Sequence, residues 1–553
     1  MSTAPSQAVA PLQELRDAVR AAAAVVRGSD GEPGVEPKLE RPKRAGQGDY
    51  ATNAALLLAP VLGEAPPRIA ARLAEELQPQ LGDSLDRAEV AGPGFLNLVL
   101  SDSWYRRALR SVLAAGERYG ADQVVSPERT LIEFVSANPT GPLVAASGRH
   151  AAYGDALARI LGHLGQDVSR EYYFNDAGSQ VRLLGESVQA RARGTELPAG
   201  GYQGDYVATL AEEIPDADSG AVEQVASQAV ALLLEKIKAT LARYGVQYDL
   251  FLSERTLHAG SPSALDRALE ELERGGHLYR SEGAVWLRTT AFGDDKDRVV
   301  VRSTGEPTYL AADLAYLVNK RDRGVQRQLI PVGADHHAWM REIRAAMAAL
   351  GGDPDTIEVP ILQFVHLIEG SERAAMSKRR GAFVTLDDLL DEIGVDATRF
   401  FMLRSSHDRT IDLDLDLARR ESAENPVYYI QYAHARIASM LRRVPDERLA
   451  DPALISGAES GSGELHQPER ALIQKLVEFP DEVQEAGSRR APHRIAAYAL
   501  ELAQQFTTFY RDCRVIGASP ESVESFRIAL SAAAGRVIAL SLGLLGVSAP
   551  DMM

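Results

Sequence analysis

Residues 136–155, SANPTGPLVAASGRHAAYGD, decide the fold of this chain. An apolar run of strand type, residues 130–135, comes directly before them, and apolar residues at helical spacing follow over residues 151–164. A strand, a tight Pro/Gly turn and a helix N-terminus in this order form a natural phosphate site, because free N–H groups and the helix dipole both attract an anion. The stretch therefore predicts an α/β fold with an anion site at the turn.

Strand-like and helix-like runs continue to alternate beyond this turn. We expect further strands at residues 166–174, 329–333 and 356–368, and a further helix at residues 338–350. Such alternation predicts a parallel sheet with right-handed crossovers. The range of about 176–290 is long and mostly helical, so we expect it to be an insertion between the halves of the sheet.

Two further regions flank this α/β core. The first is expected to hold helices and one hairpin, at residues 11–27, 50–62, 67–77 and 87–100. From about residue 421 the pattern is helical, with a polar linker at residues 451–467. We therefore predict three domains, residues 1–118, 119–420 and 421–553.

The bulk composition excludes several classes of protein. A chain of 553 residues is too long for one ordinary core, and 45% hydrophobic with 25% charged residues is typical of a soluble protein. The net charge of −17 argues against non-specific binding to nucleic acid, so no DNA partner is expected. The single cysteine, Cys513, excludes a disulfide framework and a multi-cysteine metal site. No apolar run suits a membrane span or a secretory signal, so we expect a cytoplasmic location.

The turn in the quoted stretch holds the first candidate residues. Asn138 either points into the ligand crevice, where it would fix a substrate amine or carboxylate, or caps the following bend as an Asx-turn residue. Ser147 is placed to cap the helix, a position where serine is favoured. Arg149 and His150 lie in the first helical turn, where they would face either phosphates or solvent.

Two more motifs suit substrates of opposite charge. The basic cluster of residues 373–381, RAAMSKRRG, is either a loop that clamps a triphosphate or a solvated charged loop. Tyr309 and Asp313 are four residues apart, so on a helix they share one face. A carboxylate beside a phenol would hold a guanidinium, and an ordinary helix turn with a solvated aspartate is the alternative.

The remaining candidates contain histidine and aromatic residues. Asp335, His336 and His337 follow a strand and would serve a nucleotide ribose or, less well, a metal ion, because adjacent side chains seldom converge on one ion. Two structural histidines with satisfied hydrogen bonds are the alternative. Residues 428–436, YYIQYAHAR, would either stack unpaired bases and contact phosphates or form an amphipathic core helix.

Taken together, these motifs closely resemble the arginyl-tRNA synthetases, a class I family, along nearly the whole chain. Residues 48–53 and 90–97, GDYATN and VAGPGFLN, resemble the family's extra N-terminal domain, which is associated with the outer corner of the tRNA. Residues 171–178 and 292–297 resemble its catalytic domain. Residues 376–379 resemble the signature Lys-Met-Ser-Lys-Ser/Arg, with Ala375 in place of the first lysine. The helix that begins at Tyr428 and residues 543–551 resemble its helical anticodon-binding domain.

The resemblance implies a fold and a reaction. The fold is α/β, with a class I Rossmann-like parallel-sheet catalytic domain, a small N-terminal α/β domain and a C-terminal α-helical anticodon-binding domain. The implied enzyme is an arginine–tRNA ligase, which activates L-arginine with ATP and transfers it to tRNA(Arg), releasing AMP and diphosphate. Mg²⁺ would accompany ATP. The family is usually monomeric and commonly needs bound tRNA even for the first step.

The resemblance also implies a role for individual residues. Arginine would be held by Asn138, Tyr309, Asp313 and His337. ATP would be held by Pro139, Gly141, Gly148, Asp335, His336, Met376, Ser377, Lys378 and Arg379. The tRNA would be contacted by Asn53, Phe95, Tyr429, Tyr432 and Arg436. No protein ligand set for a metal is implied.

One departure from the family pattern concerns catalysis. The first signature of the family reads His-Ile-Gly-His, and this chain has Val144, Ala145, Ala146 and Ser147 in those places. Losing one donor to a developing charge costs on the order of 3–4 kcal/mol, or about 10²–10³ in rate. We hypothesise that Ser147, His150 and Lys378 share the lost role. Two alternatives stay open: a catalytically impaired paralogue that binds tRNA or arginine, and a duplicate enzyme resistant to an inhibitor.

Overall fold

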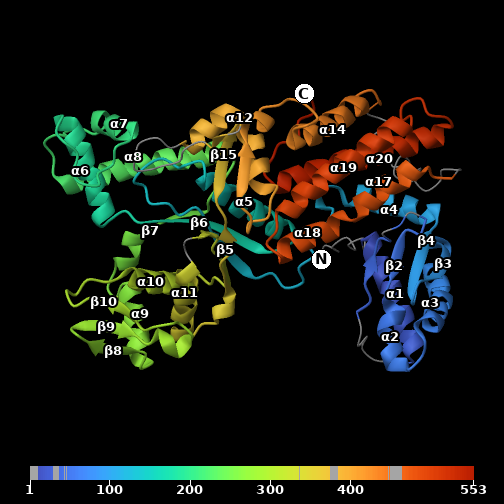
Figure 1. Ribbon diagram of the computed structural model, residues 1–553, viewed down its shortest axis with the longest axis horizontal. Helices are drawn as coiled ribbons and strands as arrows, with labels where there is room; N and C mark the ends of the chain where they lie inside the picture. The colour runs from blue at the N-terminus through green and yellow to red at the C-terminus, as the bar shows by residue number, and fades with distance from the viewer. Residues whose placement is uncertain are drawn as a thin grey trace, which may run out of the picture.

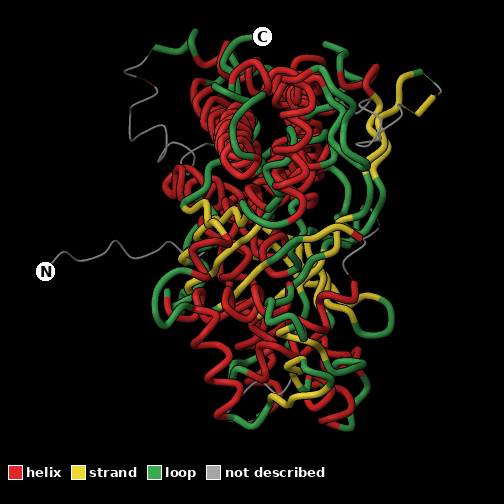
Figure 2. Tube along the Cα trace, turned by 90° about the vertical axis from the view of Figure 1, so that its left-hand side faces the viewer, coloured by secondary structure: helices red, strands yellow, loops and turns green. Residues whose placement is uncertain are grey.

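The computed structural model describes residues 10–28, 36–42, 44, 46–334, 337–370, 372–373, 384–445, 448 and 464–553, without the side chains of residues 337, 338, 372 and 373. Figure 1 shows a central sheet, two insertions on its left, a small N-terminal α/β unit at the lower right and a bundle of C-terminal helices at the upper right. In Figure 2 the yellow strands cross the middle of the molecule, with red helices on both sides of them.

The central sheet has five strands in the order β13-β11-β5-β6-β7. Their bounds are Ile357–Glu358, Arg327–Leu329, Arg129–Glu133, Asp167–Phe174 and Leu250–Ser253. Every neighbouring pair is parallel, which confirms the predicted sheet. Strand β7 lies inside the range expected to be one insertion, so the chain leaves the sheet twice rather than once.

The two insertions differ in structure. The first consists of helices α6 (Ser179–Arg193), α7 (Asp205–Glu213) and α8 (Val222–Arg243), which share a small core of their own. The second is not mostly helical. It combines α9 (Ala264–Arg274) with an antiparallel sheet of β8 (Leu278–Ser281), β9 (Ala284–Leu287) and β10 (Arg298–Val301).

Helices cover both faces of the central sheet. Helix α5 (Ser147–His163) packs on the face that carries Phe134, and α10 (Tyr309–Asp322) packs on the face that carries Glu133 and Glu171. Glu133 and Glu171 are partners in the register of β5 and β6, so they point to the same side. Helix α5 approaches closely because Gly154 has no side chain: a Cβ there would lie 2.2 Å from Cγ of Phe134.

Replacing Gly154 with alanine is therefore expected to lower the free energy of unfolding by about 1–3 kcal/mol, the usual cost of overpacking. Gly162 on the same helix offers a matched control, because a Cβ there would meet nothing within 4 Å. Gly162→Ala is expected to leave stability unchanged or raise it by up to about 1 kcal/mol, as alanine favours helix. Urea unfolding followed by circular dichroism measures both, and equal effects would contradict the packing account.

The strands expected at residues 329–333 and 356–368 are each broken. The first becomes β11 and β12 (Val332–Gly333), and the second becomes β13, β14 (Ile361–Leu362) and β15 (Val365–Glu369). Two of these three breaks fall at a proline, Pro331 or Pro360, which has no N–H to donate to a neighbouring strand. Beyond the breaks, β12 pairs with β14, and β15 pairs with β16 (Glu372–Arg373) and β17 (Ile411–Asp414).

The N-terminal unit is a four-stranded sheet packed against helices. The strand order is β1-β2-β4-β3, and the expected hairpin is present as β3 (Leu85–Ala91) and β4 (Phe95–Leu100). The helix expected from residue 50 is wrong at its start, because Tyr50–Thr52 forms β2 against β4 and buries Tyr50 and Thr52. The other elements are α1 (Pro11–Arg27), β1 (Leu39–Glu40), α2 (Ala54–Leu62), α3 (Pro66–Leu81) and α4 (Asp102–Ala115).

The C-terminal helices pack against both other units in one continuous hydrophobic core. They follow α11 (His337–Ala349), α12 (Leu386–Leu403) and α13 (Leu415–Ala418), and are α14 (Pro426–Leu441), α17 (Gln467–Val477), α18 (Phe479–Ser488), α19 (His493–Asp512) and α20 (Glu521–Leu544). Among the helices that the structure describes, α20 alone is long and apolar enough to cross a membrane, and 72% of its most apolar window is buried within the protein. Most of the expected linker at residues 451–467 lies outside the described residues.

Candidate functional site

The ligand crevice of a parallel sheet lies at the carboxyl ends of its strands, and here β5 ends in a strained turn. Val135 and Ser136 have φ angles of 66° and 42°, in the left-handed region that L residues avoid, above all β-branched ones. The turn is held by hydrogen bonds: the Ser136 N–H donates to the Phe134 carbonyl at 2.9 Å, and Ser136 Oγ accepts from the Tyr173 N–H at 3.1 Å. Strain of this kind is typical of a functional site.

Asn138 bridges the ends of two strands. Its Oδ1 accepts from the Asn175 N–H at 3.1 Å, just beyond β6, and its Nδ2 lies 3.3 Å from Oε1 of Gln180. The side chain therefore does not cap the bend at residues 139–141, which was the alternative to a ligand role. Asn138 is exposed to solvent.

The carboxylate of Asp313 lies across this edge, on the first turns of α10. Trp339 Nε1 donates to Asp313 Oδ2 at 3.0 Å. Burial in the surrounding protein raises the pKa of Asp313 to about 7, although the Trp339 hydrogen bond and Lys320 oppose the rise. The charge is therefore poorly compensated by the protein itself, and a cation bound beside it would restore a low pKa.

Tyr309 and Asp313 both lie on α10, four residues apart, as the spacing predicted. Tyr309 is the first residue of α10, and 76% of it is exposed. A second tyrosine, Tyr173, is also close enough to Asp313 to interact with it electrostatically, and its hydroxyl donates to Glu254 Oε2 at 2.7 Å. Burial and the Glu254 carboxylate raise the pKa of Tyr173 above its ordinary value. The negative charge of Asp313 adds to the rise.

A buried network of charged side chains lies between α10 and the sheet, and it was not predicted from the sequence. Lys320 Nζ lies 2.7 Å from Glu133 Oε2 and 3.8 Å from the centre of the Tyr316 ring. The Tyr316 hydroxyl donates to Glu171, which also pairs with Arg323. A glutamate inside each of two buried strands was the available signal, because such a residue is seldom buried without a partner.

The turn with the altered signature is fixed by its own backbone. The N–H groups of Ser147, Gly148 and Arg149 donate to the carbonyls of residues 144, 145 and 146, so the prediction that the first amides of α5 are free for an anion is wrong. Ala146, not Ser147, holds the N-cap position, and Ser147 is the first helical residue without a capping bond. Ser147 Oγ forms no hydrogen bond within the described residues, and its side chain is half-buried.

Two neighbours of Ser147, Gly148 and Arg149, make contacts within the protein itself. Arg149 does not face phosphates: it is buried and donates to the carbonyls of Gln363 and Ser406, at 2.6 and 2.9 Å. Burial lowers the pKa of Arg149 to about 10. Gly148 packs on α12, where a Cβ would lie 2.9 Å from Cδ1 of Leu386. His150 is half-buried.

The rest of the expected ATP site is only partly within the described residues. Pro139 is buried, and Gly141 lies against Tyr206, whose hydroxyl donates to the carbonyl of Thr140 at 2.9 Å. Asp335, His336, Met376, Ser377, Lys378 and Arg379 lie outside the described residues, as does the side chain of His337. The described residues contain no group of three His, Cys, Asp or Glu side chains arranged to hold a metal ion.

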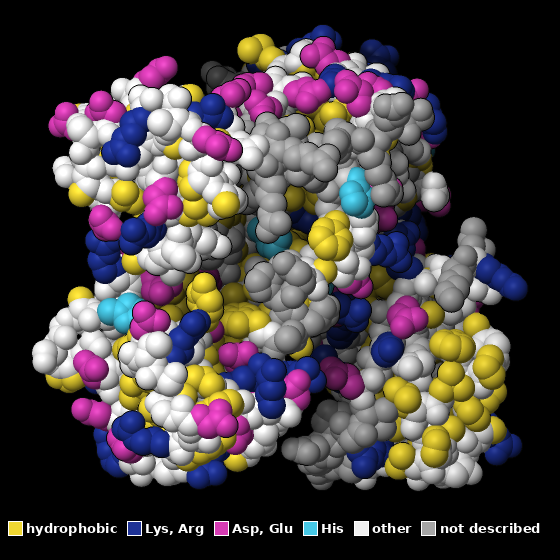
Figure 3. Space-filling model, turned by 60° about the vertical axis from the view of Figure 1, so that its left-hand side comes forward, with side chains coloured by type: hydrophobic (Ala, Val, Ile, Leu, Met, Phe, Trp, Pro, Cys, Tyr) yellow, Lys and Arg dark blue, Asp and Glu magenta, His cyan; other side chains and the backbone are white. Residues whose placement is uncertain are grey.

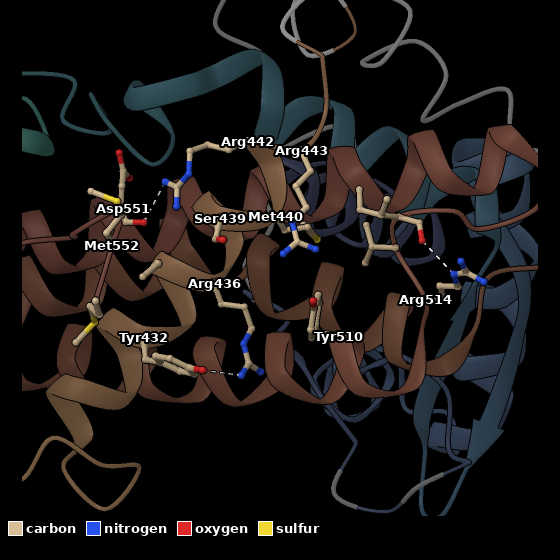
Figure 4. A pocket seen from close by; sticks show the side chains of 14 residues that line it. Tyr432, Arg436, Ser439, Met440, Arg442, Arg443, Tyr510, Arg514, Asp551 and Met552 are labelled. Carbon is tan, nitrogen blue, oxygen red and sulfur yellow. Dashed lines mark hydrogen bonds between the residues drawn. The ribbon is translucent and has the colours of Figure 1, made fainter.

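A second site lies among the C-terminal helices. It is a pocket of about 740 Å³, lined by residues of α14, α19 and the segments that follow α19 and α20, among them Tyr432, Arg436, Arg443, Tyr510, Arg514 and Met553. Arg436 donates to the Tyr432 hydroxyl at 3.0 Å and lies over the rings of both Tyr432 and Tyr510 (Figure 4). Arginines beside exposed aromatic rings suit unpaired bases and phosphates.

The other candidates for contact with RNA divide into exposed and internal residues. Tyr429 faces inward, and its hydroxyl hydrogen-bonds with Thr507 Oγ1 at 3.0 Å. Asn53 Oδ1 accepts from the Lys38 N–H at 2.8 Å and so holds a loop of the N-terminal unit. Phe95 is 40% exposed at the start of β4. Figure 3 shows apolar side chains gathered on the lobe at the lower right, which holds this unit.

Comparisons with known proteins agree along the length of the chain. Residues 13–100 match the model for the arginyl tRNA synthetase N terminal domain, residues 205–432 the class I (R) tRNA synthetase catalytic domain, and residues 430–553 the DALR anticodon binding domain. An arginine–tRNA ligase from Frankia alni is 46% identical over 529 residues, which are 93% of this chain and 94% of that protein.

Solved structures show the same arrangement. The arginyl-tRNA synthetase of Thermus thermophilus is similar with a TM-score of 0.76 and 26% identity, over 98% of this chain and 100% of that chain. The enzyme of Plasmodium falciparum, at 14% identity and a TM-score of 0.72, shares the fold over 98% of this chain and 99% of that one.

Proposed function

The chain belongs to the arginyl-tRNA synthetase family, and from that premise we propose that it activates L-arginine with ATP and transfers it to tRNA(Arg). The observation that carries the proposal is Asp313 at the carboxyl edge of the sheet, a carboxylate whose pKa is raised to about 7 because burial leaves its charge short of a partner. A guanidinium is a partner of matching geometry, since it forms bidentate contacts with a carboxylate.

The proposed first step joins the arginine carboxylate to the α-phosphorus of ATP. The carboxylate oxygen attacks phosphorus, the bond to the β-phosphate oxygen breaks, and pyrophosphate leaves. The proposed roles are an arginine site formed by Asn138, Tyr309, Asp313 and His337, with Lys378 on the ATP phosphates. In the second step a terminal ribose hydroxyl of the tRNA attacks the activated carboxyl carbon, and AMP leaves.

Further ATP contacts are proposed from the family resemblance. They are Pro139, Gly141, Gly148, Asp335, His336, Met376, Ser377 and Arg379. Mg²⁺ is proposed to arrive with ATP and to neutralise phosphate charge. The phosphates would supply most of its ligands. Attack at phosphorus then depends mainly on how the protein positions the two substrates.

The tRNA is proposed to lie across two separate surfaces. The pocket lined by Tyr432 and Arg436 would take anticodon bases, and Phe95 on the N-terminal unit would stack on a base elsewhere in the tRNA. Tyr429 and Asn53 would act indirectly, because their polar groups bond within the protein. We propose that the enzyme works in the cytoplasm as a monomer, with boundaries near residues 118 and 420.

The experiment that tests the proposal is the charging of a tRNA(Arg) transcript with labelled arginine in the presence of ATP and Mg²⁺. We expect arginyl-tRNA to form and lysine to be rejected. A catalytically impaired paralogue would bind the transcript and form no product even at high enzyme concentration, and that result would overturn the proposed function.

Ser147 and His150 are proposed to replace the missing signature histidines. The hydroxyl of Ser147 forms no hydrogen bond within the described residues, so it is available to donate to a phosphate oxygen. Ser147→Ala is expected to lower the rate of arginine activation by about 10- to 100-fold, the value of one hydrogen bond to a charged group. His150→Ala is expected to act in the same direction.

The matched control is Ser147→Thr, which keeps the hydroxyl and should retain most of the rate. Pyrophosphate exchange at saturating arginine, with tRNA(Arg) present, measures all three variants. Full activity in both alanine variants would show that other groups have taken over the role of the histidines.

A further inference from the structure

The nine residues after α20 connect the pocket of the C-terminal helices to the catalytic domain. We call residues 545–553 the tail. Its far end, with Asp551, Met552 and Met553, lines the pocket together with Tyr432 and Arg436. Arg442 donates to the Asp551 carbonyl at 3.2 Å (Figure 4), and Nδ1 of His434 lies 3.0 Å from the carbonyl oxygen of Pro550. A ligand that enters the pocket therefore touches the tail directly.

The near end of the tail is bound to helix α12 of the catalytic domain. The Ser548 N–H donates to Asp396 Oδ1 at 3.0 Å, and Gln431 Nε2 joins Asp396 Oδ2 and the Ser548 carbonyl, at 2.8 and 3.0 Å. Arg399 Nε donates to the Leu545 carbonyl at 2.9 Å. Gly546 lies so close that a Cβ there would be 2.2 Å from Nη2 of Arg399. Asp396 and Arg399 thus hold the tail from one face of α12.

Arg399 also connects α12 to the helix of the altered signature. Its side chain is fully buried, with Nη1 donating to the Tyr244 carbonyl at 2.9 Å and Nη2 to the buried carboxylate of Asp155 on α5. Asp155 also accepts from Arg159 Nε at 2.7 Å. One guanidinium therefore joins the tail, α12, α5 and the end of the first insertion.

Helix α12 consists of two halves that meet at a break. Gly394 interrupts it with φ 77° and ψ 165°, a conformation that is open almost only to glycine. The half before Gly394 begins beside the signature turn: the Ala145 N–H donates to the Val384 carbonyl at 3.0 Å, and the Leu386 N–H to the Leu143 carbonyl at 2.8 Å. The half after Gly394 carries Asp396 and Arg399. The angle at Gly394 thus relates the tail to the turn.

We propose that Asp396 and Arg399 are positioning residues for the charging reaction. They hold the tail, so that RNA bound in the pocket fixes the angle between the two halves of α12. That angle in turn fixes the position of the signature turn, residues 143–147. The inference rests on the proposed function. RNA that binds one pose of the tail more tightly than others shifts the population of α12 toward the matching angle. Such coupling is reciprocal and typically amounts to 5- to 150-fold.

The test is a double-mutant cycle between the tail contact and the anticodon. Asp396 is half-buried, so Asp396→Ala removes the contact with little risk to folding. Wild type and variant are each assayed for charging of a tRNA(Arg) transcript and of a transcript with substituted anticodon bases. Wild type is expected to lose about tenfold or more in kcat with the substituted transcript. The variant is expected to be about tenfold slower with the intact transcript and to lose less than about threefold further.

Two further variants sharpen the test. Asp391 lies on the other half of α12, where its carboxylate pairs with Arg243 rather than with the tail. The variant Asp391→Ala should therefore behave as wild type. Gly546→Ala should behave as Asp396→Ala, because its Cβ displaces Arg399. If the anticodon substitution costs the same factor in kcat in wild type and in both tail variants, the two sites are independent and the proposal is overturned.

A binding measurement separates this outcome from failure of the proposed function. If the wild-type protein charges neither transcript, the proposed function as an arginine–tRNA ligase is overturned. Hydrogen exchange at residues 143–148, with and without the anticodon stem-loop RNA alone, still tests the tail. Slower exchange in wild type that is absent in Asp396→Ala supports the coupling, and equal protection in both proteins, or none in either, overturns it.

Discussion

Asp313→Asn is expected to lower kcat/KM for arginine by about 10²- to 10³-fold, the effect of removing one partner from a desolvated ion pair. The amide can still accept from Trp339, so the local structure should persist while the charge that would pair with the guanidinium is lost. Pyrophosphate exchange as a function of arginine concentration, with tRNA(Arg) present, measures the change. The control is Asp322→Asn on the same helix, a surface carboxylate 2.9 Å from Arg267, which should stay within about twofold.

The pH dependence of the wild type follows from the same group. The pKa of Asp313 is about 7, so the carboxyl is half protonated at neutral pH, and KM for arginine should fall as pH rises from 6 to 8. The same rise in pH should strengthen arginine binding but make the folded protein less stable. Between pH 4 and 7 the unfolded chain has lost this proton while the folded chain keeps it, so the folded state binds more protons and the free energy of unfolding falls as pH rises.

Asp313→Asn should therefore stabilise the free protein at pH 8, by on the order of 1–3 kcal/mol, while it abolishes most of the activity. If Asp313→Asn keeps the rate of arginine activation within threefold of wild type, Asp313 does not bind the substrate. A variant that is also less stable would show that the carboxylate serves the fold instead.

Lys320→Met is expected to lower the free energy of unfolding by about 3–5 kcal/mol, because it leaves the carboxylate of Glu133 buried without its cation. Lys320 is 1% exposed and its ammonium is 2.7 Å from Glu133. Glu171 and Asp313 lie on the same face of the sheet, so three carboxylates would share a site with less positive charge. The pKa of Asp313 should rise further, since Lys320 holds it down, and the KM profile should shift to higher pH.

The double variant Lys320→Met/Glu133→Gln separates charge from packing. It removes the orphan charge as well as the cation, and we expect it to recover at least half of the lost stability. Lys236→Met is the surface control, because its partner Glu213 is exposed to solvent, and it should cost less than about 1 kcal/mol. Urea unfolding measures all three variants. A double variant no more stable than Lys320→Met would contradict the electrostatic account.

The architecture follows well from local sequence, and its errors have physical causes. The parallel strands β5 and β6 and the helix α5 lie within a few residues of their expected bounds, because apolar spacing reflects neighbours along the chain. Tyr50–Thr52 was expected to be helical and is a strand, because pairing with β4 outweighed its local propensity. Strand β7 escaped notice inside a helical range because a four-residue strand has almost no periodic signal.

The sites divide in the same way. Asp313 and Arg436 were found by residue type and spacing, together with a family resemblance that rests on many ordered motifs. Glu133, Lys320 and Trp339 were not found, because each acquires its role from a partner more than 20 residues away. The amides at the start of α5 were expected to be free, and only the observed turn shows that carbonyls three residues earlier already occupy them.

The sequence by itself determined the order of the domains, the parallel sheet and the family, since each depends on patterns among residues close together in the chain. Only the tertiary structure decided how the charges are satisfied and how the parts are joined. Arg399 meets Asp155 and Leu545 across separations of 244 and 146 residues. Contacts of that range are set by how helices pack around a shared core, and no local spacing encodes which buried group will face which partner.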